Sequence, residues 1–290
     1  MRHRKAEIDS LMEYLGSFEL ANFNADERSN YLNVSLDRFL KTLEVFPEGI
    51  GEKSRVLELG ANPYFMSLLM RRRYGCHLDF ANFFGDRRRA KDVEVLTSEQ
   101  FGETYRFRFG HFNVERERFP YRDGSFDLVL FCEIIEHLTM DPVHPLVQIN
   151  RILRDGGHVV ITTPNVLRHD NLRKLIMGKN VHDHYSGYGP YGRHNREYTP
   201  AELRELVEAL GFRVERLYTK VTGAVNIRGL SIKRFRGLIQ LLTTRNRGSN
   251  IFMLARKVAD ARPVYPGWLF ESMHETTGSK AGTKKKKGKR

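Results

Sequence analysis

The chain has little cysteine: Cys76 and Cys132 are the two in its 290 residues. Two thiols cannot supply the disulfide framework that stabilises small secreted domains. Long apolar runs are also lacking, since no stretch approaches the ~20 consecutive apolar residues of a membrane-spanning helix. The chain begins with the basic residues 2–5, but residues 1–15 contain no apolar run of the kind found in secretion signals. Together these absences predict a reduced, cytoplasmic protein.

Acidic residues are in the minority, but the positive excess is concentrated at one end. The formal net charge is +13, and seven of these thirteen charges belong to residues 280–290, which contain no acidic residue. A tail of lysine and glycine is typical of a solvated, disordered chain end. The charge therefore gives weak support for nucleic acid as a partner, and we favour a smaller acceptor over it.

The apolar pattern divides the chain into three parts. In residues 1–50 the segment SLDRFLKTLEVF places its apolar residues on one helical face, with Ser35 as an expected N-cap, so we expect an N-terminal helical cap. Residues 51–260 alternate strand and helix patterns. One of these helices is expected to begin at Thr199 and Pro200. Residues 261–290 form a C-terminal extension that includes the basic tail.

The alternation in residues 51–260 predicts an α/β fold with a mostly parallel, Rossmann-like sheet and helices on both faces. Seven strands are expected, the third of them after a short helix in the segment 94–113, and the last two in FRVERLYT and NIFMLARKV. Ligands bind beyond the C-terminal ends of the strands in such sheets. The strand ends here are Gly60, Asn82, Asn113 and the corner at Cys132 and Glu133.

Glycine is scarce where a nucleotide-binding loop would need it. In RVLELGANPYF, residues 55–65, an apolar strand ends in an acid, a leucine and Gly60. The two further glycines of a dinucleotide-binding G-x-G-x-x-G loop are absent. Taken alone, this segment is equally consistent with an ordinary buried strand.

Four segments in order resemble the class I S-adenosylmethionine-dependent methyltransferases over about residues 50–260. They are VLELG, FPYRDGSFDLVLFCEIIEHL, INRILRDGGHVVITTPN and REYTPAELRELVEALGF. The resemblance implies S-adenosylmethionine as cofactor and methyl transfer as the reaction. Because this cofactor has no pyrophosphate, its loop needs fewer glycines than a dinucleotide loop.

The resemblance also implies which residues bind the cofactor. Glu58 would face the methionine amine, Gly60 would allow a tight turn, and a helix beginning at Pro63 would face the methionine carboxylate. Either Asn82, which we favour, or Asp79 would bind the ribose. The remaining expected contacts are Asn62 in the loop, Asn113 and Val114 at the adenine, and Cys132 at a strand end.

The segment CEIIEHL provides the candidate catalytic residues Glu133, Glu136 and His137. Spacings of three and four would place them on one helical face towards the crevice. His137 has the intrinsic pKa of a proton acceptor near neutral pH. Glu136 and His137 could equally cap and orient the helix.

A metal site is an alternative interpretation of the same residues. Glu133, Glu136 and His137, together with His194, resemble the metal site of the small-RNA 3′-terminal ribose 2′-O-methyltransferases. Two carboxylates and two imidazoles would suit Mg²⁺ or Mn²⁺. Arg196 departs from that pattern, and small-molecule methyltransferases share E-x-x-E-H without a metal role.

The acceptor that we expect is a hydroxyl on a small molecule, a sugar or a lipid-linked intermediate. A segment rich in His, Tyr and Gly, residues 177–195, is a candidate lid over it. The basic amphipathic segment 228–247 could contact an anionic membrane surface or form an ordinary solvated face. The low glycine content of the loop also leaves open a non-catalytic partner subunit that binds the cofactor.

Overall fold

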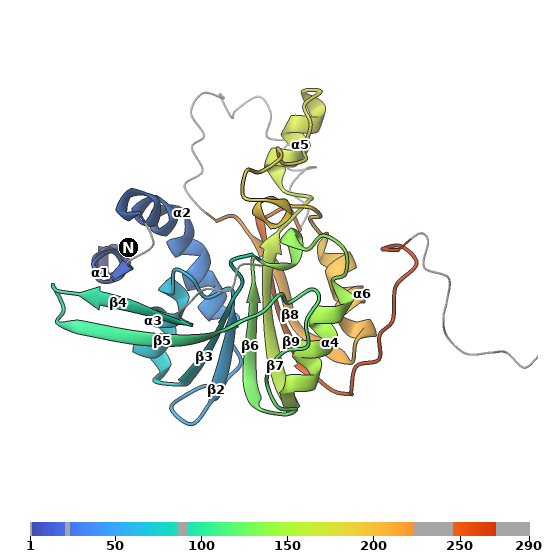
Figure 1. The fold of residues 1–290 in the computed structure, drawn as a ribbon. Coiled ribbons are helices and arrows are strands. Elements are labelled where there is room, and N and C mark those ends of the chain that lie inside the picture. Colours follow the sequence, from blue (N-terminus) through green and yellow to red (C-terminus); the bar gives the residue numbers. More distant parts are fainter. Residues whose placement is uncertain (1, 21–23, 86–91, 223–245, 271–290) are drawn as a thin grey trace, which may run out of the picture.

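The computed structural model describes residues 2–20, 24–85, 92–222 and 246–270 (Figure 1). Helices and strands alternate along most of this chain, as the sequence predicts. In chain order the elements are α1 (Arg2–Gly16), β1 (Glu19–Leu20), α2 (Ala25–Glu44), β2 (Arg55–Leu59), α3 (Phe65–Tyr74), β3 (His77–Asn82), β4 (Val93–Ser98), β5 (Glu103–His111), β6 (Phe126–Cys132), η1 (Ile135–His137), α4 (Val143–Ile152), β7 (Leu153–Pro164), α5 (His169–Ile176), η2 (Pro190–Gly192), α6 (Pro200–Ala209), β8 (Phe212–Lys220) and β9 (Asn250–Lys257).

A single sheet runs through the described residues in the order β1-β4-β5-β3-β2-β6-β7-β9-β8. The five strands from β5 to β7 pair in parallel, and β9 lies antiparallel between β7 and β8. The predicted seven strands are therefore present, from β5 to β8, and β4 and β1 extend them to nine. The mostly parallel α/β fold is confirmed.

The expected short helix in segment 94–113 was wrong. Residues Val93–Ser98 form β4, which pairs antiparallel with β5 from Val93 opposite Arg108 to Ser98 opposite Glu103. Buried and more exposed side chains alternate along β4, the period of a strand rather than of a helix. Gly102, at a φ of +62°, lies in the turn that reverses the chain.

The N-terminal end of α6 is where the sequence predicts it, but that of α2 is not. Thr199 caps α6 in a capping box with Glu202, as expected for a Thr-Pro start. α2 begins ten residues before the expected Ser35, because Asn24 is its N-cap and accepts from the backbone of Asp26. Ser35 is instead buried in the middle of the helix.

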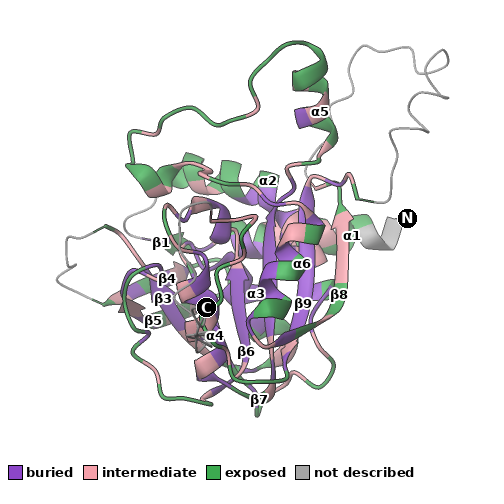
Figure 2. Cartoon of the chain, turned by 90° about the vertical axis from the view of Figure 1, so that its right-hand side faces the viewer, coloured by how far each residue is buried: buried purple, intermediate pink, exposed green. Residues whose placement is uncertain are grey.

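The N-terminal helices share a hydrophobic core with the sheet. Leu36 and Phe39 of α2 belong to one buried cluster with Val56 of β2 and Leu68 of α3. Figure 2 shows the buried residues gathered in the strands, whereas α5 stands away from the sheet with mostly exposed residues. Helices in residues 1–50 are thus confirmed, and α2 contributes to the core of the fold. The domain boundaries at 50 and 260 stay predictions.

None of the helices in the described part of the chain is long and apolar enough to cross a membrane. Residues 223–245 lie outside the described residues, and so does most of the basic segment 228–247. The tail 271–290 is also outside them. The described start of the C-terminal extension packs back on the fold, with Trp268 donating to Glu205 of α6 at 2.7 Å.

Candidate active site

Two adjoining pockets lie at the C-terminal ends of the parallel strands. The α2 pocket, about 200 Å³, lies between α2 and the loop after β2, and the β3 pocket, about 180 Å³, lies against the ends of β3 and β5. Gly60, Glu133 and Ile134 line both. Gly60 has a φ of +68°, and a Cβ there would be 3.1 Å from Cδ1 of Ile134. The turn therefore favours glycine, and a Cβ there would also press on Ile134 where the two pockets meet.

The α2 pocket brings together four of the predicted cofactor-binding residues. They are Glu58, Gly60, Asn62 and Cys132. Residues of α2 that the sequence analysis did not identify complete the opposite wall, and they are Tyr31, Arg38, Phe39 and Thr42. These residues belong to a helix without any methyltransferase motif, so no sequence signal indicated them.

Glu58 is buried beneath this pocket. The Oγ of Ser67 in α3 donates to the Oε2 of Glu58. Burial raises the pKa of the Glu58 carboxyl to about 8, and the bond from Ser67 only partly opposes this. A carboxyl with this pKa is largely protonated at pH 7, which weakens it as a partner for an ammonium group. The expected contact of Glu58 with the methionine amine stays a prediction.

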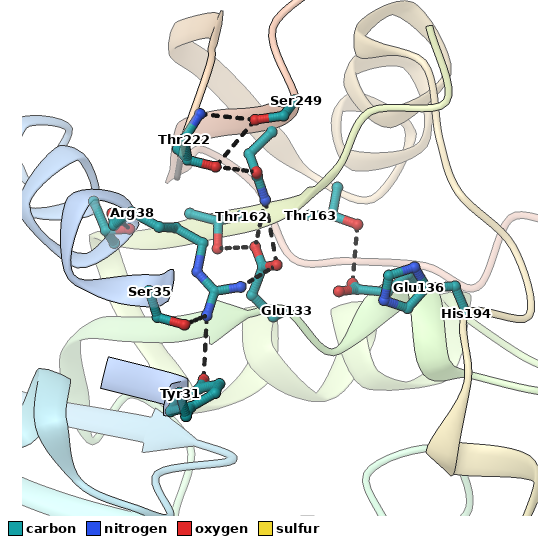
Figure 3. Close-up of polar contacts among 12 residues, drawn as sticks. Tyr31, Ser35, Arg38, Glu133, Glu136, Thr162, Thr163, His194, Thr222 and Ser249 are labelled. Carbon is teal, nitrogen blue, oxygen red and sulfur yellow. Dashed lines mark hydrogen bonds and ion pairs between the residues drawn. The ribbon is translucent and has the colours of Figure 1, made fainter. Parts of the chain in front are cut away.

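Arg38 and Glu133 form an ion pair inside the α2 pocket (Figure 3). Arg38 also donates to the Oη of Tyr31 at 3.1 Å, and Glu133 accepts from the Oγ1 of Thr162 at 2.8 Å and from Asn250 at 3.2 Å. Burial disfavours the charge of Arg38, but Glu133, with Tyr31 and Glu136, more than offsets this and holds the pKa of the guanidinium above its ordinary value. Both charged groups are thus fixed in position by neighbours on other elements.

The shared helical face expected for Glu133, Glu136 and His137 was wrong. Glu133 has a φ of +54°, in the left-handed region, which ends the strand and prevents a continuous helix. Only residues Ile135–His137 are helical, as a single 3₁₀ turn. Glu133 therefore lies with Arg38, while Glu136 lies apart from that pair (Figure 3). Glu136 belongs instead to a cluster with His137 and His194.

The β3 pocket has a mostly apolar lining that contains three further predicted residues, Asn82, Asn113 and Val114. Asp79, the alternative to Asn82, is not among them. It lies three residues before the end of β3 and accepts from the Nε of Arg55 at 2.8 Å. Of the two candidates for the ribose, the structure places only Asn82 at the site.

Asn82 is also part of a buried network beneath the loop. Its Oδ1 accepts from the backbone N–H of Asn62 at 3.0 Å, and its Nδ2 donates to the Oη of Tyr64 at 2.9 Å. The hydroxyl of Tyr64 in turn donates to Glu94 of β4 at 2.7 Å. Tyr64 has a φ of +69° and is the N-cap of α3, so the helix begins after Tyr64 and not at Pro63 as expected.

His137 faces the β3 pocket with one ring nitrogen fixed. Its Nδ1 lies 2.9 Å from the carbonyl oxygen of Arg193. Because a carbonyl only accepts, Nδ1 carries the proton and Nε2 has a free lone pair. Burial, and then the charge of His194, lower the pKa of His137. The ring is therefore neutral and oriented.

Glu136, His137 and His194 form a compact cluster in which one ligand atom of each lies within 4.8 Å of the others. Glu136 is fully buried. Its Oε2 accepts from Thr163 at 2.9 Å, but its Oε1 has no hydrogen-bond partner. Burial, and then the charge of Glu133, raise the pKa of Glu136 well above its ordinary value. An unpartnered buried oxygen beside two imidazoles is an arrangement that suits a cation or a shared proton.

The hydrogen bonds of the two histidines also suit a metal site. The Nδ1 of His194 lies 3.0 Å from Glu197, which raises the pKa of His194, and the Nδ1 of His137 contacts a backbone carbonyl. The Nε2 of His137 is thus available as a ligand, and the Nε2 of His194 would become one on losing its proton to a bound metal ion. Such outer partners orient histidines that bind metals. Three of the four residues in the metal hypothesis are thus together, and the fourth, Glu133, is paired with Arg38 instead.

The candidate lid, residues 177–195, contributes Tyr191 to the β3 pocket. The Oη of Tyr191 accepts from Asn113 at 3.0 Å and donates to Glu115 at 2.8 Å. The sequence indicated the segment but not this residue. Its other tyrosines, Tyr185 and Tyr188, are exposed.

Comparisons with known proteins show which proteins this chain resembles. The profile of a family described as "Methyltransferase domain" matches residues 27–217. A protein of Mycolicibacterium smegmatis named "Probable S-adenosylmethionine-dependent methyltransferase" is 34% identical over 96 residues, which are 33% of this chain and 32% of that protein. The glycine/sarcosine/dimethylglycine N-methyltransferase of Actinopolyspora halophila is 25% identical over 158 residues, 54% of this chain and 26% of that protein.

Among solved structures, one similar chain comes from the complex between the Trm112 methyltransferase activator and a methyltransferase of Haloferax volcanii. It has a TM-score of 0.52 and 14% identity, with 87% of this chain and 98% of that chain covered. This likeness shows the fold. The chain spans about a third or less of the length of the curated relatives it matches.

The family match covers well over half of the chain, so the protein belongs to the methyltransferase domain family.

Proposed function

We propose that the enzyme methylates a hydroxyl group of a small-molecule, sugar or lipid-linked acceptor, with His137 as the proton acceptor. A hydroxyl differs from an amine acceptor in needing removal of a proton as the methyl group arrives. The observation that carries the proposal is the contact of His137 Nδ1 with the Arg193 carbonyl at 2.9 Å. This contact leaves the lone pair of Nε2 free, 3.9 Å from the Oε1 of Glu136, in a residue that lines the β3 pocket.

The two pockets support a cofactor placed across Gly60. When bound, S-adenosylmethionine supplies a methyl group on a cationic sulfonium, so little further activation of the donor is needed. The charged α2 pocket suits the amino-acid end, and the mostly apolar β3 pocket suits the adenosine. The work left to the protein is alignment and exclusion of water. Tyr191 supports this, because it lines the β3 pocket from the candidate lid.

A methyl-transfer assay with radiolabelled S-adenosylmethionine tests this proposal. Polar metabolite, glycan, lipid and small-RNA extracts serve as acceptor pools, and methylated products are identified as ethers or amines. His137→Gln is expected to lower turnover by about 10²- to 10⁴-fold, the range of general base catalysis, while S-adenosylhomocysteine affinity stays within about threefold. An N-methyl product, or unchanged turnover in His137→Gln, would contradict the role given to His137.

A second candidate function is favoured by the unpartnered Oε1 of Glu136. In it, Glu136, His137 and His194 hold a divalent cation, which would polarise the acceptor hydroxyl. The resemblance to RNA ribose 2′-O-methyltransferases would then extend to the acceptor. RNA binding that is absent even at low salt would remove the RNA acceptor and leave the small-molecule one.

A non-catalytic role as a cofactor-binding partner subunit is the third hypothesis. Cofactor affinity without transfer to any acceptor pool would support it, and turnover would remove it.

We also propose a reducing, cytoplasmic location, because Cys76 and Cys132 are both free thiols.

A further inference from the structure

We propose that Arg38 and Glu133 together hold the amino-acid end of the cofactor, with Arg38 binding its carboxylate and Glu133 its ammonium group. This inference rests on the cofactor placement proposed above. It assigns the head group to a helix outside the methyltransferase motifs, and it replaces the contact with Glu58 that the sequence predicts.

One residue is a candidate to bind the carboxylate of the cofactor. Among the described residues that line the α2 pocket, Arg38 is the one with a positive charge. Its Nη1 contacts Glu133 and its Nη2 donates to Tyr31 and Ser35, and the remaining N–H groups of the guanidinium can donate to a carboxylate in a charge-assisted hydrogen bond. Arg38 lies on α2 and lines the same pocket as Gly60 and the loop that carries it.

The ammonium has two anionic candidates, Glu58 and Glu133. Glu58 is hydrogen-bonded to Ser67 of α3, and its buried carboxyl has a pKa raised to about 8. Glu133 lies beside Arg38 at the boundary between the two pockets. Its left-handed backbone directs the side chain to this boundary rather than into a helix. Glu133 is therefore the better partner for a cation in the α2 pocket.

Binding of a zwitterion would leave each charge in the pocket paired. Without the cofactor, Arg38 and Glu133 neutralise one another. With it, each protein charge gains a partner of opposite sign on the head group, so neither is left buried and alone, which is the costly case. Ser35 and Thr162 hold the two side chains from opposite sides, at 3.3 Å from Arg38 and 2.8 Å from Glu133. The pair is thus preorganised, which limits the entropy lost on binding.

Titration calorimetry with two ligands tests the inference. S-adenosylhomocysteine carries the head group, and 5′-methylthioadenosine has the same nucleoside and thioether but no amino acid. Arg38→Gln is expected to weaken the binding of S-adenosylhomocysteine by about 30-fold or more. The affinity for 5′-methylthioadenosine should change less than threefold. Glu133→Gln is expected to show the same selectivity. Arg38→Lys should restore part of the affinity, because its ammonium is a point charge without the paired donors.

Arg55→Gln is the matched control, since Arg55 is also paired with a carboxylate, Asp79, but lies outside the α2 pocket. It should change neither affinity. Thermal unfolding of each variant, and of the double variant Arg38→Gln/Glu133→Gln, which leaves no unpaired charge, separates binding from folding. If the Arg38 and Glu133 variants lose affinity for both ligands equally, or for neither, the head-group assignment is overturned and the methyltransferase proposal stands. If the wild-type protein binds neither ligand, the cofactor placement itself is wrong.

Discussion

The backbone N–H of Asn62 donates to the Oδ1 of Asn82 across 3.0 Å, joining the loop after β2 to the end of β3. The residue that the sequence indicates for the ribose is therefore also a support of the cofactor loop. Its amide nitrogen is engaged with Tyr64 as well. Both polar atoms of the side chain have partners within the protein, which an isolated motif cannot reveal.

Asn82→Asp separates the two roles of this residue. The carboxylate would still accept from Asn62 but could not donate to Tyr64, whose hydroxyl already donates to Glu94. We expect a loss of about 1–3 kcal/mol in stability, because buried polar groups lose a partner. S-adenosylhomocysteine affinity is expected to fall as the loop loosens. Tighter binding by the aspartate variant, measured by calorimetry, would instead assign residue 82 mainly to the ribose.

Tyr64→Phe tests the same network from its centre. The change removes the hydroxyl between Asn82 and Glu94 without altering the ring, which is fully buried. We expect about 1–3 kcal/mol of destabilisation in urea unfolding, since two buried polar groups lose a partner. Tyr188→Phe is the control, because Tyr188 is 91% exposed. Equal, small effects in both variants would show that the network contributes nothing.

The buried carboxyl of Glu58 makes the stability of the fold depend on pH. Its pKa is raised from 4.5 to about 8 by burial. Below pH 4.5 the carboxyl is protonated in both folded and unfolded chains. Between about pH 4.5 and 8 only the unfolded chain ionises it, so its contribution to stability falls as the pH rises, by roughly 5 kcal/mol in all.

Glu58→Gln removes that dependence. The difference in melting temperature, variant minus wild type, is expected to increase from pH 5 to pH 8. Glu99→Gln, at an exposed position, serves as the control. A difference that is the same at both pH values would show that Glu58 is ionised in the folded protein.

Manganese titration tests the cluster of Glu136, His137 and His194. One Mn²⁺ is expected to bind the wild-type protein, and His194→Ala should abolish measurable binding. Glu197→Gln, which alters the partner of His194 Nδ1, is expected to reduce affinity by about 10- to 100-fold. His182→Ala, at an exposed position, is the control. If the wild-type protein binds no Mn²⁺, the metal-assisted function is removed and the role of His137 as base is unaffected.

The fold was predictable because its signals are local. Strand and helix patterns repeat in order, and a Thr-Pro pair with Glu202 defines the start of α6. The site was predictable only in part. Gly60 and Asn113 follow from strand ends, whereas Arg38 reaches the pocket from a helix nearly one hundred residues away from its partner Glu133. Such a contact is a property of tertiary packing.

Local backbone geometry explains the other differences. The spacing of CEIIEHL suggested a helix, but one left-handed residue, Glu133, separates its carboxylate from the Glu136 cluster. The alternating pattern of β4 was obscured by its polar residues, so a strand was taken for a helix. In both places a single local choice of backbone conformation decides which side chains meet.

The central claim is that the cofactor lies across Gly60, with its two ends in the two pockets. Calorimetry with S-adenosylhomocysteine on the wild type and on Gly60→Ala tests it most directly. A Cβ at Gly60 would enter the space beside Ile134, so we expect micromolar binding by the wild type and at least a tenfold loss in the variant. Gly102→Ala, at a similar positive φ in the β4–β5 turn with open space around it, should bind as the wild type does. Equal affinity in Gly60→Ala and the wild type would contradict the claim.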